Sequence, residues 1–104
     1  MIVDVRTYTL IPRKTPHYLE KFEKLALPVV KRHGLELMGF YTSQIGALNQ
    51  VVHLWRYESL ADLETKRNAR DADPAWAEFL ASTEGMVLVQ EDKIMKPTSF
   101  SPKP

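Results

Sequence analysis

The chain has 104 residues, a length typical of one domain, and its formal net charge of +1 is too balanced for a nucleic-acid-binding surface. It contains no cysteine, which excludes disulfides, thiolate nucleophiles and thiolate metal sites. No apolar run is long enough to span a bilayer, and the first residues have the pattern of a strand rather than a secretory leader. We therefore predict a cytoplasmic protein without nucleic-acid or membrane partners.

The N-terminal third of the chain predicts a strand followed by a helix. Residues 2–10 are rich in β-branched and aromatic side chains and contain no glycine or proline, which is typical of a strand. Thr15 as the N-cap and Pro16 as the first helical residue begin a helix that ends at Gly34. Pro28 lies inside this helix, where its missing N–H is expected to kink the preceding turn.

Three more strands are predicted, at residues 36–44, 50–58 and 86–95. The first two are joined by a hairpin connection that contains Gly46 and Asn49. A second helical region separates the last two strands.

This second helical region is expected to be broken. Ser59 and Asp62 form a variant of the capping box at its start. Asp73 followed by Pro74 repeats the pattern of an N-cap and a first helical residue, so a new helix should begin near Pro74.

The order βαββαβ fits an α+β, ferredoxin-like domain with a four-stranded antiparallel-type sheet. We expect residues 1–97 to form one domain and residues 98–104 an extended tail. The strands at 2–10 and 50–58 should form the central pair, which we predict to be parallel. Helices cover one face of such a sheet, but these strands are apolar on both faces. The uncovered face therefore predicts a homodimer through sheet-to-sheet packing.

Four stretches together resemble the NIPSNAP family: VRTYTL with Arg6 and Tyr8, KRHG, GFYTSQIGALNQVVHLWRYESL, and DPAWAEFL. They occur in family order over nearly the whole chain, and the block from Gly39 to Leu60 is the most specific. The resemblance implies a dimeric α/β barrel, whereas bacterial members are largely without an assigned reaction. Families related by this barrel include cofactor-independent monooxygenases, haem-degrading enzymes and pigment-type dismutases. Haem is therefore a candidate cofactor by fold analogy only.

His53 lies in the middle of a central strand and shares a face with Trp55 and Tyr57. One interpretation is a core histidine that is hydrogen-bonded to its neighbours. The other is a general acid or base in a pocket. Trp55 is likewise either a packing residue or one wall of an apolar pocket for a flat molecule.

Arg6 and Tyr8 share one face of the first strand. A charge in a central strand needs a partner, and Asp4 on the same face, or Glu91 or Asp92 on the last strand, can provide it. The alternative is that Arg6 captures an anionic ligand while Tyr8 donates a hydrogen bond to it.

Lys66, Arg67 and Arg70 form a basic cluster in the second helical region, and Arg67 and Arg70 share a helix face. Such a cluster is either a solvated surface or the mouth of a pocket that attracts an acid.

Two functions from different classes remain open. The first is binding of a small aromatic or acidic organic molecule, with metal-independent, monooxygenase-like catalysis as its enzymatic form. His17, His33 and His53 lack the spacing of metal ligands, so no metal site is expected. The alternative is a non-enzymatic interaction or assembly module whose aromatic strands build the dimer core. The site candidates are His53 for catalysis through proton transfer, and Arg6, Tyr8, Trp55 and Arg70 for ligand binding.

Overall fold

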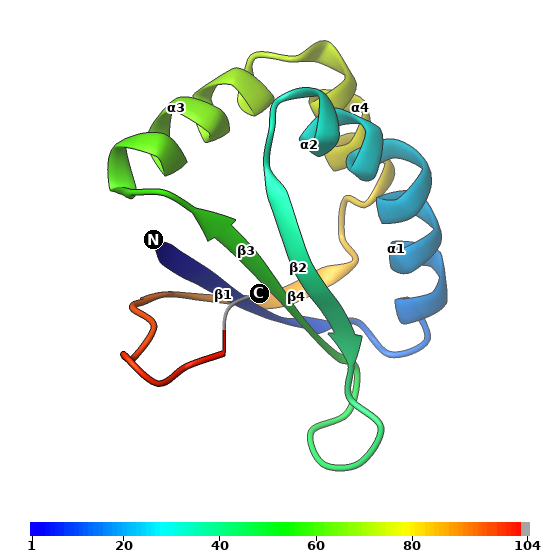
Figure 1. Ribbon diagram of the computed structural model, residues 1–104. Coiled ribbons are helices and arrows are strands. Elements are labelled where there is room, and N and C mark those ends of the chain that lie inside the picture. Colours follow the sequence, from blue (N-terminus) through cyan, green and yellow to red (C-terminus); the bar gives the residue numbers. More distant parts are fainter. Residues whose placement is uncertain (103–104) are drawn as a thin grey trace.

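The computed structural model describes residues 1–102, and Figure 1 shows its helices gathered on one side of a four-stranded sheet. The strands are β1 (Ile2–Leu10), β2 (Glu36–Thr42), β3 (Gln50–Tyr57) and β4 (Val87–Met95). The helical segments are α1 (Thr15–Lys21), the π-helical turn η1 (Phe22–Ala26), α2 (Leu27–Arg32), α3 (Leu60–Asp71) and α4 (Pro74–Ser82). The predicted α+β, ferredoxin-like order is confirmed.

The sheet has the strand order β2-β3-β1-β4, and each neighbouring pair is antiparallel. β1 and β3 are the central pair, as predicted, but the prediction that they run parallel is wrong. The helical crossover after β1 returns β2 parallel to β1, and the short β2–β3 connection then reverses the chain, so β3 runs against β1. This register places Arg6 between His53 of β3 and Asp92 of β4, and it places Asp4 opposite Trp55.

The first helical region is irregular where the sequence predicts a kink. The backbone N–H of Leu27 bonds to the carbonyl of Phe22, five residues back, and Pro28 follows directly. Pro28 has no N–H to donate, so the ordinary helical ladder cannot pass through this turn. Thr15 is the first helical residue rather than the predicted N-cap, because the preceding turn already places Lys14 in helical backbone.

The caps predicted for the second helical region are confirmed. The Ser59 hydroxyl accepts a hydrogen bond from the Asp62 N–H at 3.1 Å, and the Asp62 carboxylate accepts one from the Glu58 N–H at 2.9 Å. Asp73 caps α4 by accepting from the Ala75 N–H at 3.0 Å. The predicted break therefore separates α3 from α4.

Replacing the α3 cap, Ser59→Ala, is expected to lower the free energy of unfolding by about 1 kcal/mol, because one helix N–H loses its acceptor. Urea unfolding measures the change. The exposed tail residue Ser99 provides the control, and Ser99→Ala is expected to change stability by less than about 0.5 kcal/mol. Equal effects of the two substitutions would contradict a capping role.

The two faces of the sheet differ in burial. The face toward the helices carries Trp55 and Tyr57, which are 4% and 1% exposed, together with Tyr8. The opposite face carries Val5 and Leu54, which are half-buried in the single chain. The aromatic side chains of β3 therefore face the helices. In the described part of the chain, no helix covers the other face, as Figure 1 shows.

The C-terminal segment continues past the last strand. β4 ends at Met95, shortly before the predicted domain boundary at residue 97. In the predicted tail, 98–104, Phe100 is 85% exposed, and residues 103–104 lie outside the described residues.

Candidate functional site

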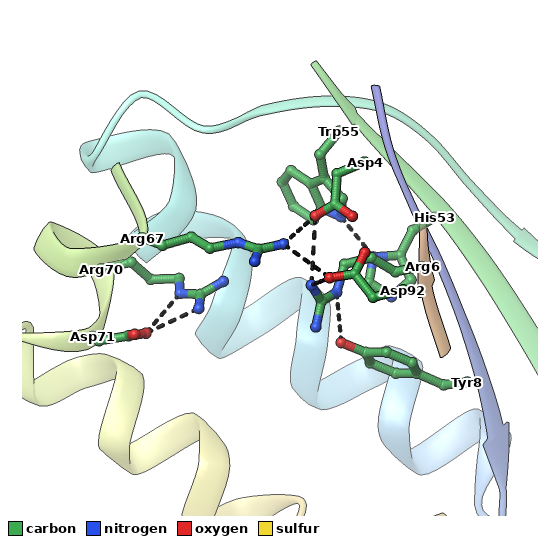
Figure 2. A network of polar contacts seen from close by, with 9 residues as sticks. All are labelled: Asp4, Arg6, Tyr8, His53, Trp55, Arg67, Arg70, Asp71 and Asp92. Carbon is green, nitrogen blue, oxygen red and sulfur yellow. Dashed lines mark hydrogen bonds and ion pairs between the residues drawn. The ribbon is translucent and has the colours of Figure 1, made fainter. Parts of the chain in front are cut away.

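A cavity of about 400 Å³ lies between the central strands and the helices. All five candidate residues predicted from the sequence line it, and Figure 2 shows them from close by. They come from β1, β3 and α3, segments far apart in the sequence. The lining also contains side chains that sequence reasoning did not select as site residues, among them Tyr18, Phe22, Arg67, Trp76 and Phe79.

His53 is buried in an aromatic environment. Phe40 stacks on the imidazole ring, with centroids 4.5 Å apart and an interplanar angle of 5°, and the Tyr8 ring meets it edge-on at 4.8 Å. The Trp55 indole N–H donates a hydrogen bond of 2.7 Å to His53 Nδ1. Because Nδ1 accepts, the proton of the neutral imidazole is on Nε2.

The protonation state of His53 follows from the same environment. Burial, and to a smaller extent the nearby positive charge of Arg6, lower the pKa of His53 to about 3. The ring is therefore neutral at physiological pH, and its Nε2–H has no hydrogen-bond partner among residues 1–102. In this geometry His53 is a hydrogen-bond donor, since a proton-accepting role requires Trp55 to release Nδ1.

Arg6 is held by neighbouring acids, as the ion-pair interpretation predicts. Its guanidinium lies 2.9 Å from the Asp92 carboxylate and 3.4 Å from that of Asp4, and its Nε–H donates to the Tyr8 hydroxyl at 2.8 Å. Arg67 reaches across from α3, as Figure 2 shows, and contacts the same two carboxylates. The cluster thus joins a helix to the two strands β1 and β4.

The two carboxylates of this cluster have opposite pKa shifts. Asp4 is fully buried, and burial together with its neighbour Asp92 raises its pKa to about 6, against the lowering effect of Arg67 and Arg6. For Asp92, burial also acts to raise the pKa. The contact with Asp4 and the positive charges of the two arginines outweigh that effect, so the pKa of Asp92 is lowered. The pair therefore has one carboxyl group that takes up a proton more readily than the other.

Arg70 lies at another part of the cavity wall. Its guanidinium stacks over the Trp76 ring at 4.5 Å and pairs with Asp71 at 2.9 Å. Arg67 and Arg70 both line the cavity, whereas Lys66 pairs with Asp62 on its own helix at 3.2 Å. Of the predicted basic cluster, two members therefore belong to the site.

The remaining histidines lie elsewhere. His17 is exposed, and His33 contacts Asp73 at 2.8 Å. Within residues 1–102, no three potential ligands are grouped closely enough to bind a metal ion. His53 does not offer an axial ligand for haem in this geometry, because its free ring nitrogen carries the proton and has no lone pair to donate. None of the helices formed by residues 1–102 is both long and apolar enough to cross a membrane.

The antiparallel βαββαβ sheet, with an aromatic cavity and an ionic cluster beneath its helices, defines a small ferredoxin-like α+β domain. The profile of the NIPSNAP family matches residues 3–102, nearly the whole chain. The chain belongs to the NIPSNAP family.

Relatives agree with this assignment. The protein NipSnap of Drosophila melanogaster is 33% identical over 101 residues, which are 97% of this chain and 36% of that protein. The chain thus spans about a third of the length of this curated relative. A NIPSNAP family protein of unknown function from Agrobacterium tumefaciens is 40% identical, with a TM-score of 0.93 over 98% of this chain and 92% of that one.

The fold extends beyond the family. A putative antibiotic biosynthesis monooxygenase from Nitrosomonas europaea superimposes with a TM-score of 0.69 over 93% of this chain and 98% of that one. Its sequence identity is 12%, so the likeness concerns the fold alone.

Proposed function

We propose that the protein binds a small, planar organic molecule in the cavity between the sheet and the helices. The carrying observation is a cavity of about 400 Å³, within the ordinary range for ligand sites, with aromatic walls and a polar cluster on one side. Trp55, Phe22 and Trp76 offer flat apolar surfaces to an aromatic ring. A binding role alone is proposed, because a likeness of fold at 12% sequence identity supports no particular reaction.

Each candidate residue has a role in this proposal. Arg6 and Tyr8 form the polar end of the cavity, and Trp55 forms one apolar wall. Arg70 stacks on Trp76 at the cavity wall formed by α3 and α4. His53 offers its Nε2–H to the ligand, a role that its hydrogen bond from Trp55 supports better than proton transfer. The cytoplasm remains the proposed compartment, with which the absence of cysteine is compatible.

Native mass spectrometry of the protein as purified from cells tests this function. We expect a reproducible mass above that of the polypeptide, retained through gentle desolvation. Trp76→Ala opens the cavity wall and should abolish the retained mass. Leu60→Ala changes an exposed apolar residue outside the cavity and should preserve it. An identical retained mass in the Trp76→Ala protein would show that the ligand is bound outside this cavity and would contradict the proposal.

A second proposal, assembly into a homodimer, is favoured by the uncovered sheet face. Val5 pairs with Leu54 across the central strands of this face, and Val89 and Met95 of β4 extend it while remaining 55% and 50% exposed. Glu91 and Lys93 lie between Val89 and Met95 on this face and pair with each other at 3.2 Å. An uncovered face whose centre is apolar and whose edge carries matched charges is expected to pack against a second copy of itself.

The subunit count tests the assembly. Native mass spectrometry should give twice the subunit mass for the unmodified protein, and Leu54→Glu should give a monomer because it places a charge in the packed face. Leu60→Glu, at an exposed helix position, is the control and should leave the dimer intact. A dimer that persists in Leu54→Glu would show that copies meet through another surface.

A further inference from the structure

Three buried polar atoms without partners among residues 1–102 belong to residues that line the proposed binding cavity. In the part of the chain that the structure describes, three buried side-chain atoms have no hydrogen-bond partner: Asp4 Oδ1, His53 Nε2 and Arg67 Nε. All three residues line the cavity. Buried polar groups are nearly always satisfied, and each one left unpaired costs about 1–3 kcal/mol. Their concentration at one cavity is therefore expected if a bound molecule completes the hydrogen bonds.

The three residues meet at the same part of the sheet. Asp4 is opposite Trp55 in the β1–β3 ladder, and His53 is the next inward-facing residue of β3. The Arg67 side chain extends from α3 and contacts the Asp4 carboxylate. The three atoms are covered in this conformation, so a molecule bound over this part of the ladder reaches them as neighbouring side chains move aside.

The chemistry of each atom defines what the ligand must present. An ionised Asp4 Oδ1 only accepts hydrogen bonds, so it requires a donor. His53 Nε2 carries the ring proton, because Nδ1 accepts from Trp55, and therefore requires an acceptor. Arg67 Nε–H also requires an acceptor. A carbonyl oxygen has two lone pairs and can receive both donors while a neighbouring N–H or O–H group serves Asp4.

The charges of the site argue against an acidic ligand. The guanidinium groups of Arg6 and Arg67 are already matched by the carboxylates of Asp4 and Asp92, and Arg70 is matched by Asp71. A ligand carboxylate would find no surplus cation and would lie beside the buried Asp4. An additional buried charge without a partner is strongly unfavourable.

We infer that the ligand is an uncharged aromatic molecule with a hydrogen-bond donor beside a carbonyl on one edge, such as an aryl amide, a lactam or a hydroxy-aryl ketone. The inference rests on the proposed binding function and specifies its ligand class. It selects the aromatic alternative over the acidic one that the sequence leaves open.

Three probes of similar shape test this selectivity. Benzamide has the donor and the carbonyl, acetophenone has the carbonyl alone, and benzoate is an anion without a donor. Titrations are followed by the NMR signals of the Trp55 indole N–H and the Arg67 Nε–H at pH 7.5, where Asp4 is mostly ionised. We expect benzamide to bind at least about tenfold more tightly than either of the others, the factor that corresponds to one satisfied hydrogen bond to a charged group.

Two variants assign the selectivity to the named atoms. Asp4→Asn removes the charge that opposes an anion, so benzoate should gain affinity over benzamide by about tenfold or more. Arg67→Lys keeps the charge but removes Nε–H. It should weaken benzamide several-fold and provides the test if Asp4→Asn does not fold. Glu64→Gln, at an exposed position of α3 outside the cavity, is the matched control and should leave all three affinities unchanged.

The outcomes separate this inference from the function on which it rests. Equal binding of the three probes, or a preference for benzoate in the unmodified protein, would overturn the ligand class while leaving the cavity as a binding site. The absence of shifts from every probe at its solubility limit would overturn the binding function itself. A preference for benzamide that Asp4→Asn and Arg67→Lys both leave intact would also overturn the assignment.

Discussion

The Arg67→Ala protein is expected to be about 3 kcal/mol less stable than the unmodified protein at pH 7.5, a loss typical of breaking a buried ion pair by removing one partner. Asp4 is fully buried, and Arg67 contacts its carboxylate directly from α3. Without Arg67, the remaining cation near Asp4 is Arg6, at 3.4 Å, which is shared with Asp92. The buried carboxylate is then poorly compensated, and α3 loses its polar contact with the sheet.

The pH dependence of this loss distinguishes the charge effect from a packing effect. The pKa of Asp4 is already raised to about 6, and removing Arg67 takes away an effect that lowers it. At pH 5 the variant can neutralise Asp4 by binding a proton, so the stability difference should shrink. Urea unfolding at pH 5 and 7.5 measures both values. A loss of the same size at both pH values would indicate missing packing rather than an uncompensated charge.

Arg32 provides the matched control for this substitution. It is also paired with an aspartate, since it lies 2.8 Å from Asp73, but its side chain is 52% exposed. Arg32→Ala should therefore cost less than about 1 kcal/mol, as is usual for exposed pairs. If Arg32→Ala were as damaging as Arg67→Ala, burial of Asp4 could not be the cause.

Much of the fold follows from local chemistry that can be recognised in the sequence. Ser59 and Asp73 cap helices because a hydroxyl or carboxylate at those positions reaches the free N–H groups of the next turn, whatever surrounds them. Pro28 likewise disturbs its helix through its own covalent structure. The direction of β3 relative to β1 is different, because it depends on how the crossover and the hairpin combine, and there the parallel prediction fails.

The site could be predicted only in part, for a related reason. Period-two alternation places Arg6 beside Asp4 and Tyr8, and His53 beside Trp55, so those neighbours are visible in the sequence. Arg67 is 63 residues from Asp4, and its helix position is compatible with both a solvated surface and a cavity wall. Trp76 has the same ambiguity on α4. The donor role of His53 depends on the atom to which Trp55 donates, and sequence alone does not determine that.

His53→Asn is expected to gain stability relative to the unmodified protein as the pH falls below 6.5, by about 1.4 kcal/mol per pH unit. Native His53 stays neutral down to about pH 3, whereas the unfolded chain protonates the ring near pH 6.5. The unfolded state therefore binds more protons in this window, and acid destabilises the unmodified protein through this residue. The asparagine side chain of the variant does not titrate, and its carbonyl can still accept the hydrogen bond from Trp55.

Asp4 affects the pH dependence of the free energy of unfolding with the opposite sign, over an overlapping pH range. Its native pKa of about 6 exceeds the value of 3.8 in the unfolded chain, so its contribution is present at low pH and is lost as the pH rises through about 6. Between about pH 4 and 6 the two residues should nearly cancel in the unmodified protein. Asp4→Asn should therefore lose stability relative to it as the pH falls, opposite to His53→Asn.

Urea unfolding of the three proteins at several pH values between 4 and 8, at one protein concentration, measures these slopes. The differences from the unmodified protein are informative because carboxylates remote from both residues, such as Asp62, contribute equally to all three. The slope of Asp4→Asn reports the Asp4–Asp92 pair together, because the contact with Asp4 helps to lower the pKa of Asp92. Diverging curves of opposite sign would support a neutral His53 that acts as a donor within the cavity. Parallel curves for His53→Asn and the unmodified protein would mean that the native imidazole titrates normally, and the proton-transfer role predicted from the sequence would then regain its physical basis.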